Sequence, residues 1–106
     1  MLTVNFYEKN GKYVGFKVDG HADYAESGQD IVCASVSSAV QLTSNLITQN
    51  FGINARVGVD KKTNAVTLRV AEIRDEADKI LRGFKQHLEL VSHEFENTIN
   101  IYISEV

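Results

Sequence analysis

The residues best suited to chemistry lie in one stretch of the sequence, residues 20–37. It holds the only cysteine of the chain, Cys33, and one of its three histidines, His21. A cysteine thiolate is a strong nucleophile, and a nearby imidazole can take up the thiol proton, as in cysteine hydrolases. A loop of about a dozen residues can bring its two ends together at a modest entropic cost. The pair therefore predicts a nucleophile, Cys33, with His21 as its base.

The expected place of Cys33 in the fold strengthens this interpretation. Asp30 is a good N-cap for a helix over residues 31–50, which would put Cys33 in the first helical turn. Backbone N–H groups there have no intrahelical partner and would favour thiolate over thiol, and they could also serve as an oxyanion hole. Ser37 follows one turn later on the same face and could donate a hydrogen bond to the sulfur. Asp30 and Ser37 are thus supporting candidates.

Plainer interpretations of the same residues stay open. A lone cysteine is often a small buried hydrophobe, and His21 could be an ordinary turn histidine. A zinc site built from His21, Asp23, Asp30 and Cys33 would match no standard ligand spacing and would contain one thiol. We expect no metal and no cofactor.

The elements that must position these residues follow from the apolar pattern. Strict alternation predicts strands, and apolar residues three and four apart predict helices with one buried face. The stretch around His21 has no period and a glycine near each end, which is typical of a loop. The expected elements are two strands within 2–19, a loop over 20–29, a helix over 31–50, two strands within 53–70, a helix over 73–95 and a strand over 99–103. The order ββαββαβ indicates one α+β domain over residues 1–106, with an antiparallel-rich five-stranded sheet and two helices on one face.

Composition narrows the classes of function. The chain has 106 residues and a net charge of −3, so no overall basic field favours nucleic acid or an anionic membrane. A single cysteine excludes an internal disulfide and favours a reducing compartment. We see no signal peptide at the amino terminus, and no apolar run reaches the roughly 18 residues of a membrane span. The expectation is a cytoplasmic protein without membrane or direct nucleic-acid binding.

The chemistry-bearing stretch also resembles a known family. Its residues are Gly20-His21-Ala22, a short loop that includes Asp23 and Tyr24 and ends at Gly28, then Asp30-Ile31-Val32-Cys33-Ala34, with Ser37 beyond. This motif is similar to that of the Prp family, the ribosomal-processing cysteine proteases of Firmicutes. Chain length and element order extend the similarity over essentially the whole chain.

The resemblance implies an endopeptidase that removes a short N-terminal extension from large-subunit ribosomal protein L twenty-seven during ribosome assembly. It implies that His21 and Cys33 are catalytic and that Asp30 and Ser37 line the site. Residues 22–29 would form a flap that contacts the substrate, with Gly20 at its base, and the protein would be a homodimer. The family's substrates carry bulky apolar and aromatic residues before the scissile bond. Two alternatives stay open, a ribosome-associated module that binds a peptide without cutting it and another small thiol hydrolase or transferase.

Overall fold

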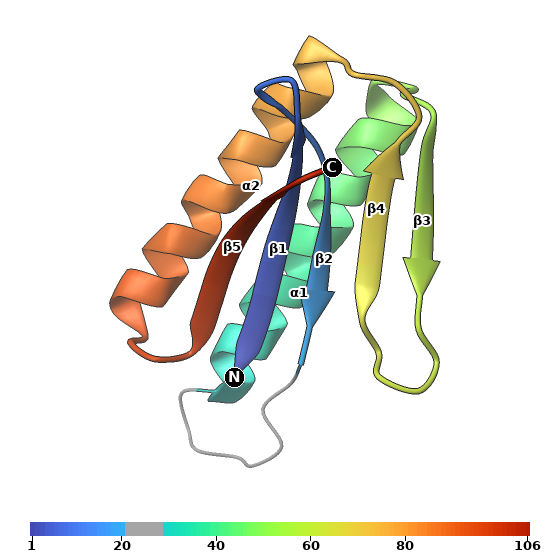
Figure 1. Cartoon of the computed structure of the whole chain (residues 1–106). Helices are drawn as coiled ribbons and strands as arrows, with labels where there is room; N and C mark the ends of the chain where they lie inside the picture. Colours follow the sequence, from blue (N-terminus) through green and yellow to red (C-terminus); the bar gives the residue numbers. More distant parts are fainter. Residues whose placement is uncertain (21–28) are drawn as a thin grey trace.

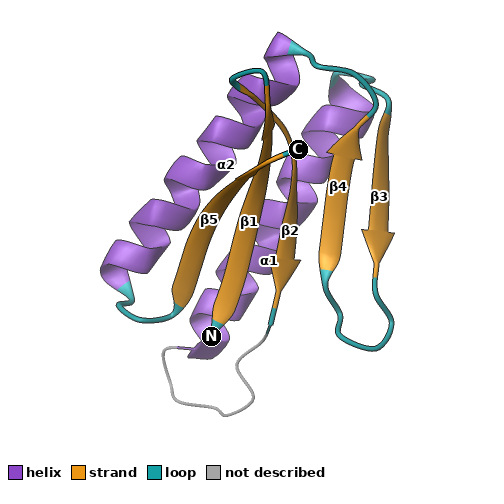
Figure 2. Cartoon of the chain, in the orientation of Figure 1, coloured by secondary structure: helices purple, strands orange, loops and turns teal. Residues whose placement is uncertain are grey.

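The computed structural model of the chain describes residues 1–20 and 29–106, and its elements follow the expected order ββαββαβ (Figures 1 and 2). They are β1 (Leu2–Lys9), β2 (Lys12–Asp19), α1 (Gln29–Asn45), a π-helical turn η1 (Leu46–Asn50), β3 (Ala55–Val59), β4 (Val66–Val70), α2 (Asp75–Glu94) and β5 (Ile99–Glu105).

The five strands form one sheet in the order β3-β4-β2-β1-β5. β5 pairs with β1 in parallel, and the other three neighbouring pairs are antiparallel. Both helices lie on the same face of the sheet, behind it in the view of Figure 1. The predicted α+β class, with an antiparallel-rich sheet and two helices on one face, is confirmed.

Aromatic side chains dominate the layer between the sheet and α2. Phe6 of β1 and Phe16 of β2 are directly opposite each other and fully buried. Phe84 of α2 packs edge-on against both rings, with centroid distances of 5.7 Å and 5.0 Å. Edge-to-face pairs of this kind stabilise a core by about 0.5–1.5 kcal/mol each beyond the area that they bury. The buried apolar residues of α2 step by three and four along the helix, as its pattern predicted, and Asp78 is buried beside them; these apolar residues are Ala77, Leu81, Phe84 and Leu88.

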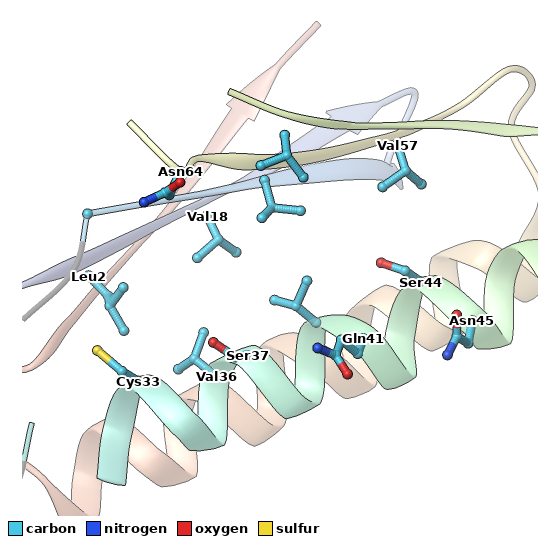
Figure 3. Close-up of a pocket in the computed structure, with 14 residues that line it drawn as sticks. Leu2, Val18, Cys33, Val36, Ser37, Gln41, Ser44, Asn45, Val57 and Asn64 are labelled. Carbon is cyan, nitrogen blue, oxygen red and sulfur yellow. The ribbon is translucent and has the colours of Figure 1, made fainter. Parts of the chain in front are cut away.

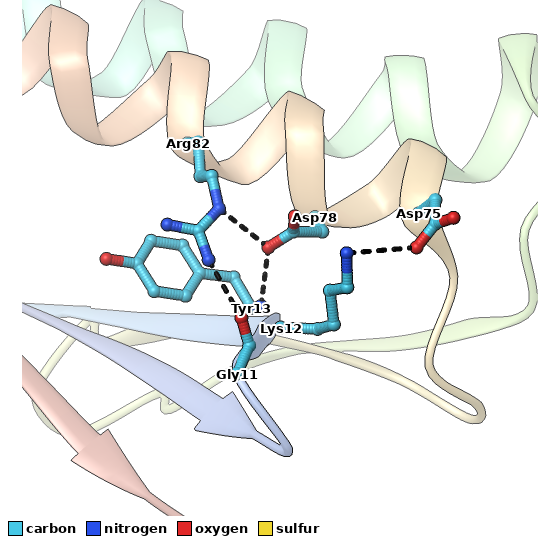
Figure 4. A network of polar contacts seen from close by, with 6 residues as sticks. All are labelled: Gly11, Lys12, Tyr13, Asp75, Asp78 and Arg82. Carbon is cyan, nitrogen blue, oxygen red and sulfur yellow. Dashed lines mark hydrogen bonds and ion pairs between the residues drawn. The ribbon is translucent and has the colours of Figure 1, made fainter.

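One buried carboxylate ties the β1–β2 hairpin to α2 (Figure 4). Asp78 accepts hydrogen bonds from the Tyr13 backbone N–H at 2.7 Å and from Arg82 Nε at 2.9 Å. The Arg82 guanidinium also donates to the carbonyl of Gly11 and lies 4.3 Å from the centre of the Tyr13 ring. Burial disfavours the charged carboxylate, but the Tyr13 N–H and Arg82 outweigh burial and hold the pKa of Asp78 below its ordinary value.

The first helical segment does not end as a regular α-helix. The Phe51 N–H donates to the carbonyl of Leu46, five residues back, at 2.9 Å, and Gly52 then takes a positive φ of 61°. The predicted end near Asn50 and Gly52 is confirmed, whereas the π-helical turn was not predicted.

By length and composition alone, the stretch Ile31–Asn50 could cross a membrane, contrary to the expectation from the sequence. The core helix of a soluble protein passes the same test, and one face of this stretch packs into the domain core. Its buried apolar residues are Val32, Val36, Val40 and Ile47.

Candidate active site

A cleft of about 680 Å³ separates α1 from the half of the sheet formed by β2, β4 and β3 (Figure 3). Side chains of α1 form one wall, and valines of the strands form the facing wall. The α1 wall consists of Cys33, Val36, Ser37, Val40, Gln41, Ser44 and Asn45. The facing wall consists of Leu2, Val18, Gly20, Val57, Val59, Asn64 and Val66. None of these side chains is charged, so the cleft is apolar with a few neutral hydrogen-bonding groups.

Cys33 lies at one end of this cleft, near Leu2, and is partly exposed (Figure 3). Ser37 lies one helical turn further along the same wall and is exposed. The prediction that these two residues share a helix face is therefore confirmed. A partly exposed thiol in the wall of a cleft is accessible to a bound ligand, unlike a cysteine that only fills the core.

The helix begins earlier than the sequence predicted. The described part of α1 already includes Gln29 and Asp30, so Asp30 is a helical residue and not the N-cap. The predicted loop over 20–29 is correspondingly too long at this end. Aspartate favours the N-cap position, but glutamine is a good helix former, and Gln29 extends the helix beyond Asp30 towards the N-terminus.

This correction changes the expected environment of Cys33. Cys33 is at least one residue beyond the first helical turn, where a regular helix pairs each N–H with the carbonyl four residues back. The hypothesis that unpaired N–H groups surround the thiol, and supply an oxyanion hole, therefore loses its geometric basis.

Gly20 is the last residue of the described range 1–20, and it lines the same cleft as Cys33. Its φ is +88°, and a Cβ built on it would lie 2.5 Å from the carbonyl oxygen of Met1. Only glycine fits both the backbone conformation and the close approach. The Asp19 carboxylate accepts a hydrogen bond from the Gly20 N–H at 2.7 Å, which fixes the end of β2.

The remaining predicted site residues, His21, Ala22, Asp23, Tyr24 and Gly28, lie outside the described residues. The expectation that residues 22–29 form a substrate flap lies there too, apart from Gln29, which belongs to α1 and not to a loop. Among the side chains of residues 1–20 and 31–106, no three of His, Cys, Asp or Glu come together in a way that could hold a metal ion.

The sequence alone did not identify the far end of the cleft. The Ser44 hydroxyl lines it, is buried, and has no hydrogen-bond partner among the described residues. Val57 and Val59 of β3 face it and are exposed, although strand valines usually pack into a core. Spacing could have indicated Ser44, because α1 returns to the same face at Cys33, Ser37, Gln41 and then Ser44. Spacing could not have indicated the valines, because it is the order of the strands in the sheet that places β3 opposite α1.

Comparison with known proteins identifies the family. The family model described as Cysteine protease Prp matches residues 1–100. A curated protein of Staphylococcus aureus named ribosomal processing cysteine protease Prp is 29% identical over 103 residues, which cover 95% of this chain and 97% of the relative. Its namesake in Bacillus subtilis is 24% identical over 93 residues, 83% of each chain.

Solved structures agree with this family over the whole fold. A crystal structure of the S. aureus Prp protease in complex with a substrate peptide superimposes with a TM-score of 0.87 at 27% identity, over 98% of this chain and 100% of that one. A second structure of the S. aureus protein, with a covalently linked product peptide, gives a TM-score of 0.85 at 28% identity, over 98% and 100% of the two chains. The chain therefore belongs to the cysteine protease Prp family and is a cysteine protease, not a module that binds peptides without cutting them.

Proposed function

We propose that this protein is an endopeptidase that uses Cys33 as its nucleophile and removes the N-terminal extension of large-subunit ribosomal protein L twenty-seven. The observation that carries the proposal is the position of the thiol. A cysteine protease needs a cysteine, the chain has one, and that one lies in the wall of an apolar cleft of about 680 Å³.

The general base follows by elimination among three histidines. His87 and His93 belong to α2, are exposed, and are not among the residues of the cleft wall. The third, His21, directly follows Gly20, which does line the cleft. We therefore assign His21 as the base that takes the proton of the Cys33 thiol. Asp30, close to Cys33 in α1, is retained as a supporting residue.

The reaction then runs in two steps. The Cys33 thiolate attacks the carbonyl carbon of the scissile peptide bond. The C–N bond breaks, protonated His21 gives its proton to the leaving amine, and the acyl group stays on Sγ as a thioester. Neutral His21 next takes a proton from water, whose oxygen attacks the thioester. The C–S bond breaks with Cys33 leaving as the thiolate, and the product acid loses its proton to solvent and departs as a carboxylate.

The cleft wall supports an apolar peptide as the substrate. None of its described side chains is charged. Seven of them are aliphatic, namely Leu2, Val18, Val36, Val40, Val57, Val59 and Val66. Burying such surface against bulky side chains stabilises a complex by roughly 25 cal/mol per Å². The exposed hydroxyl of Ser37 lies on the same wall and is suited to bond the peptide backbone of an extended substrate. The relatives named as ribosomal processing proteases make a ribosomal protein extension the natural candidate.

The direct test is to incubate the protein with the full-length ribosomal protein of the same organism and to read the products by mass spectrometry. We expect one cut that releases a short N-terminal peptide. Cys33→Ala and His21→Ala should each lower the rate by several orders of magnitude. The matched control is Ser38→Ala, an exposed α1 position that does not line the cleft, which should cleave normally. Cleavage by folded Cys33→Ala would refute the assignment.

The homodimer and the cytoplasmic location belong to the same proposal. A groove of about 400 Å³ between α1 and α2, on the side away from the catalytic cleft, is lined by Leu42, Leu46, Ile80 and Phe84. Leu42 is 62% exposed there, which suits burial against a second copy. Sedimentation should show a dimer at micromolar concentration and a monomer for Leu42→Glu. A wild-type monomer would contradict this part of the proposal alone.

A further inference from the structure

The face of the sheet that the helices leave uncovered carries cationic, aromatic and polar side chains that peptide cleavage does not use. Because side chains alternate along a strand, the neighbours of the buried residues Phe6, Phe16 and Leu68 must point to this face. We call it the open face and define it by its ten central residues. They are Thr3, Asn5, Tyr7, Lys17, Arg56, Thr67, Arg69, Asn100, Tyr102 and Ser104. It faces the viewer in Figure 1.

Two arginines lie directly opposite each other on this face. Arg56 of β3 pairs in register with Arg69 of β4, and both are exposed. Like charges in this position are destabilising. Among the described residues, no carboxylate forms an ion pair with either of them. A repulsive pair that the fold does not neutralise is well suited to an anion that binds from solution.

A third cation, Lys17, extends the pattern, and none of the ten residues of the open face is a carboxylate. Lys17 of β2 lies next to Thr67 in the adjoining row. Asp19 is at the far end of β2, where it accepts the hydrogen bond from the Gly20 N–H. The net charge of −3 for the whole chain therefore conceals a face of the opposite sign.

Aromatic rings lie in the same rows as the cations. The Arg69 guanidinium is 5.6 Å from the centre of the Tyr7 ring, and Gly15, the residue between them in the sheet, has no side chain to block this contact. Tyr102 of β5 is diagonally adjacent to Tyr7 and is 54% exposed. Diagonal neighbours across two strands are roughly 7–8 Å apart, a spacing that successive unstacked bases can match.

We propose that the open face binds single-stranded RNA. The cations would contact phosphates, while Tyr102 and the guanidinium held by Tyr7 would stack on bases. The hydroxyls and amides between them, on Thr3, Asn5, Thr67 and Asn100, are suited to base edges and to the ribose 2′-hydroxyl. An acidic protein could bind the same cations, but its carboxylates would make no stacking contact with the exposed ring of Tyr102. Among the described residues, both helices lie on the other side of the sheet, so neither could enter the groove of a duplex bound to the open face.

The test is fluorescence anisotropy with a labelled oligouridine of about ten nucleotides, a length within the range of a small binding domain. We expect a dissociation constant in the micromolar range, typical of binding that depends mainly on phosphates. If three phosphates are neutralised, binding should weaken roughly 20-fold between about 50 mM and 200 mM salt. Alkylation of Cys33 with iodoacetamide should leave binding unchanged, because the thiol lies on the helix side of the sheet.

Two variants locate the site. The double variant Arg56→Gln and Arg69→Gln should lose most of the salt dependence and weaken binding at least tenfold. It should unfold at the same or a higher urea concentration, because a like-charge pair has been removed. Tyr102→Ala should weaken binding about 5-fold or more through lost stacking. The matched control, Lys79→Gln with Lys85→Gln on α2, removes the same charge and should bind as wild type.

Several outcomes would overturn the proposal. Absence of binding at low salt would do so, as would equal loss in the α2 control, which would indicate only a bulk charge effect. Equal affinity for oligothymidine would overturn the choice of RNA. Equal affinity for polyglutamate, together with wild-type binding by Tyr102→Ala, would identify an acidic polypeptide as the partner instead. Loss of binding after alkylation of Cys33 would place the RNA in the catalytic cleft.

Discussion

Replacing Gly20 by alanine tests how the fold fixes the chain next to the cleft that contains Cys33. The residue needs a φ of +88°, which costs an L-amino acid about 1–2 kcal/mol. The added Cβ would also lie 2.5 Å from the Met1 carbonyl oxygen, a backbone atom that cannot rotate away. Moving Met1 endangers the adjoining hydrogen bond from the Leu2 N–H to the Thr98 carbonyl, which contributes about 1 kcal/mol. The total loss of unfolding free energy should be about 2–3 kcal/mol.

Gly11 provides the matched control for this substitution. It has a similar φ of +77°, but a Cβ there would meet nothing within 4 Å. Gly11→Ala should therefore lower the unfolding free energy only by the cost of the positive φ, about 1–2 kcal/mol. A difference of 1 kcal/mol corresponds to about 4–8 °C in Tm for a domain of this size, so Gly20→Ala should melt at least about 4 °C below Gly11→Ala.

Cleavage kinetics extend the comparison to the proposed role of the cleft. Leu2 and Gly20 both line the cleft, so a shift of the Met1–Leu2 backbone should lower kcat/KM in Gly20→Ala below its Tm. Gly11 is at the opposite end of β2, and Gly11→Ala should cleave normally while folded. If the two variants melt within about 2 °C of each other, the contact with Met1 does not constrain the chain, and the reasoning is wrong.

Three further predictions concern other parts of the molecule. Because its pKa is lowered in the fold, Asp78 stabilises the protein above the pKa of the unfolded chain, and this stability is lost as the pH falls through the folded pKa. Asp78→Asn should therefore lower the unfolding free energy by about 1–2 kcal/mol at pH 7 and flatten the acid limb of urea titrations, whereas the exposed Asp75→Asn should change neither. Ser37→Ala should raise KM for the peptide with little change in folding, and an unchanged KM would mean that the substrate does not contact this part of the cleft. Val59→Lys should raise KM for an apolar peptide about tenfold or more, because it places a charge in the cleft, and it should not slow alkylation of Cys33. The control is Thr63→Lys, at an exposed position that does not line the cleft.

Local patterns in the sequence predicted most elements, and non-local pairing supplied what they missed. The alternation of Leu2, Val4 and Phe6 has one physical cause, a strand with one buried face, and the structure confirms it. Asp30 was misplaced because both capping and helical conformations are open to it, and the difference depends on its neighbours.

The cleft was only half predictable for the same reason. Cys33 and Ser37 share a face by helical spacing, which the sequence reveals. Val57 and Val59 line the facing wall because β4 lies beside β2 and brings β3 opposite α1, and no local signal encodes that order. The parallel pairing of β5 with β1 is equally invisible in either strand alone.

That pairing of β5 with β1 has a consequence for biosynthesis. Leu2 is in register with Ile99, so the sheet cannot be completed until nearly the whole described chain has been synthesised. Contacts between residues so distant in sequence form slowly, and until β5 arrives β1 is an open edge with Val4 and Phe6 along it, which favours aggregation. Leu2, whose side chain lies near Cys33, is fixed by the same pairing. In a nascent or prematurely terminated chain, the Leu2 end of the cleft would therefore be held by the β1–β2 pairing alone until β5 has been synthesised.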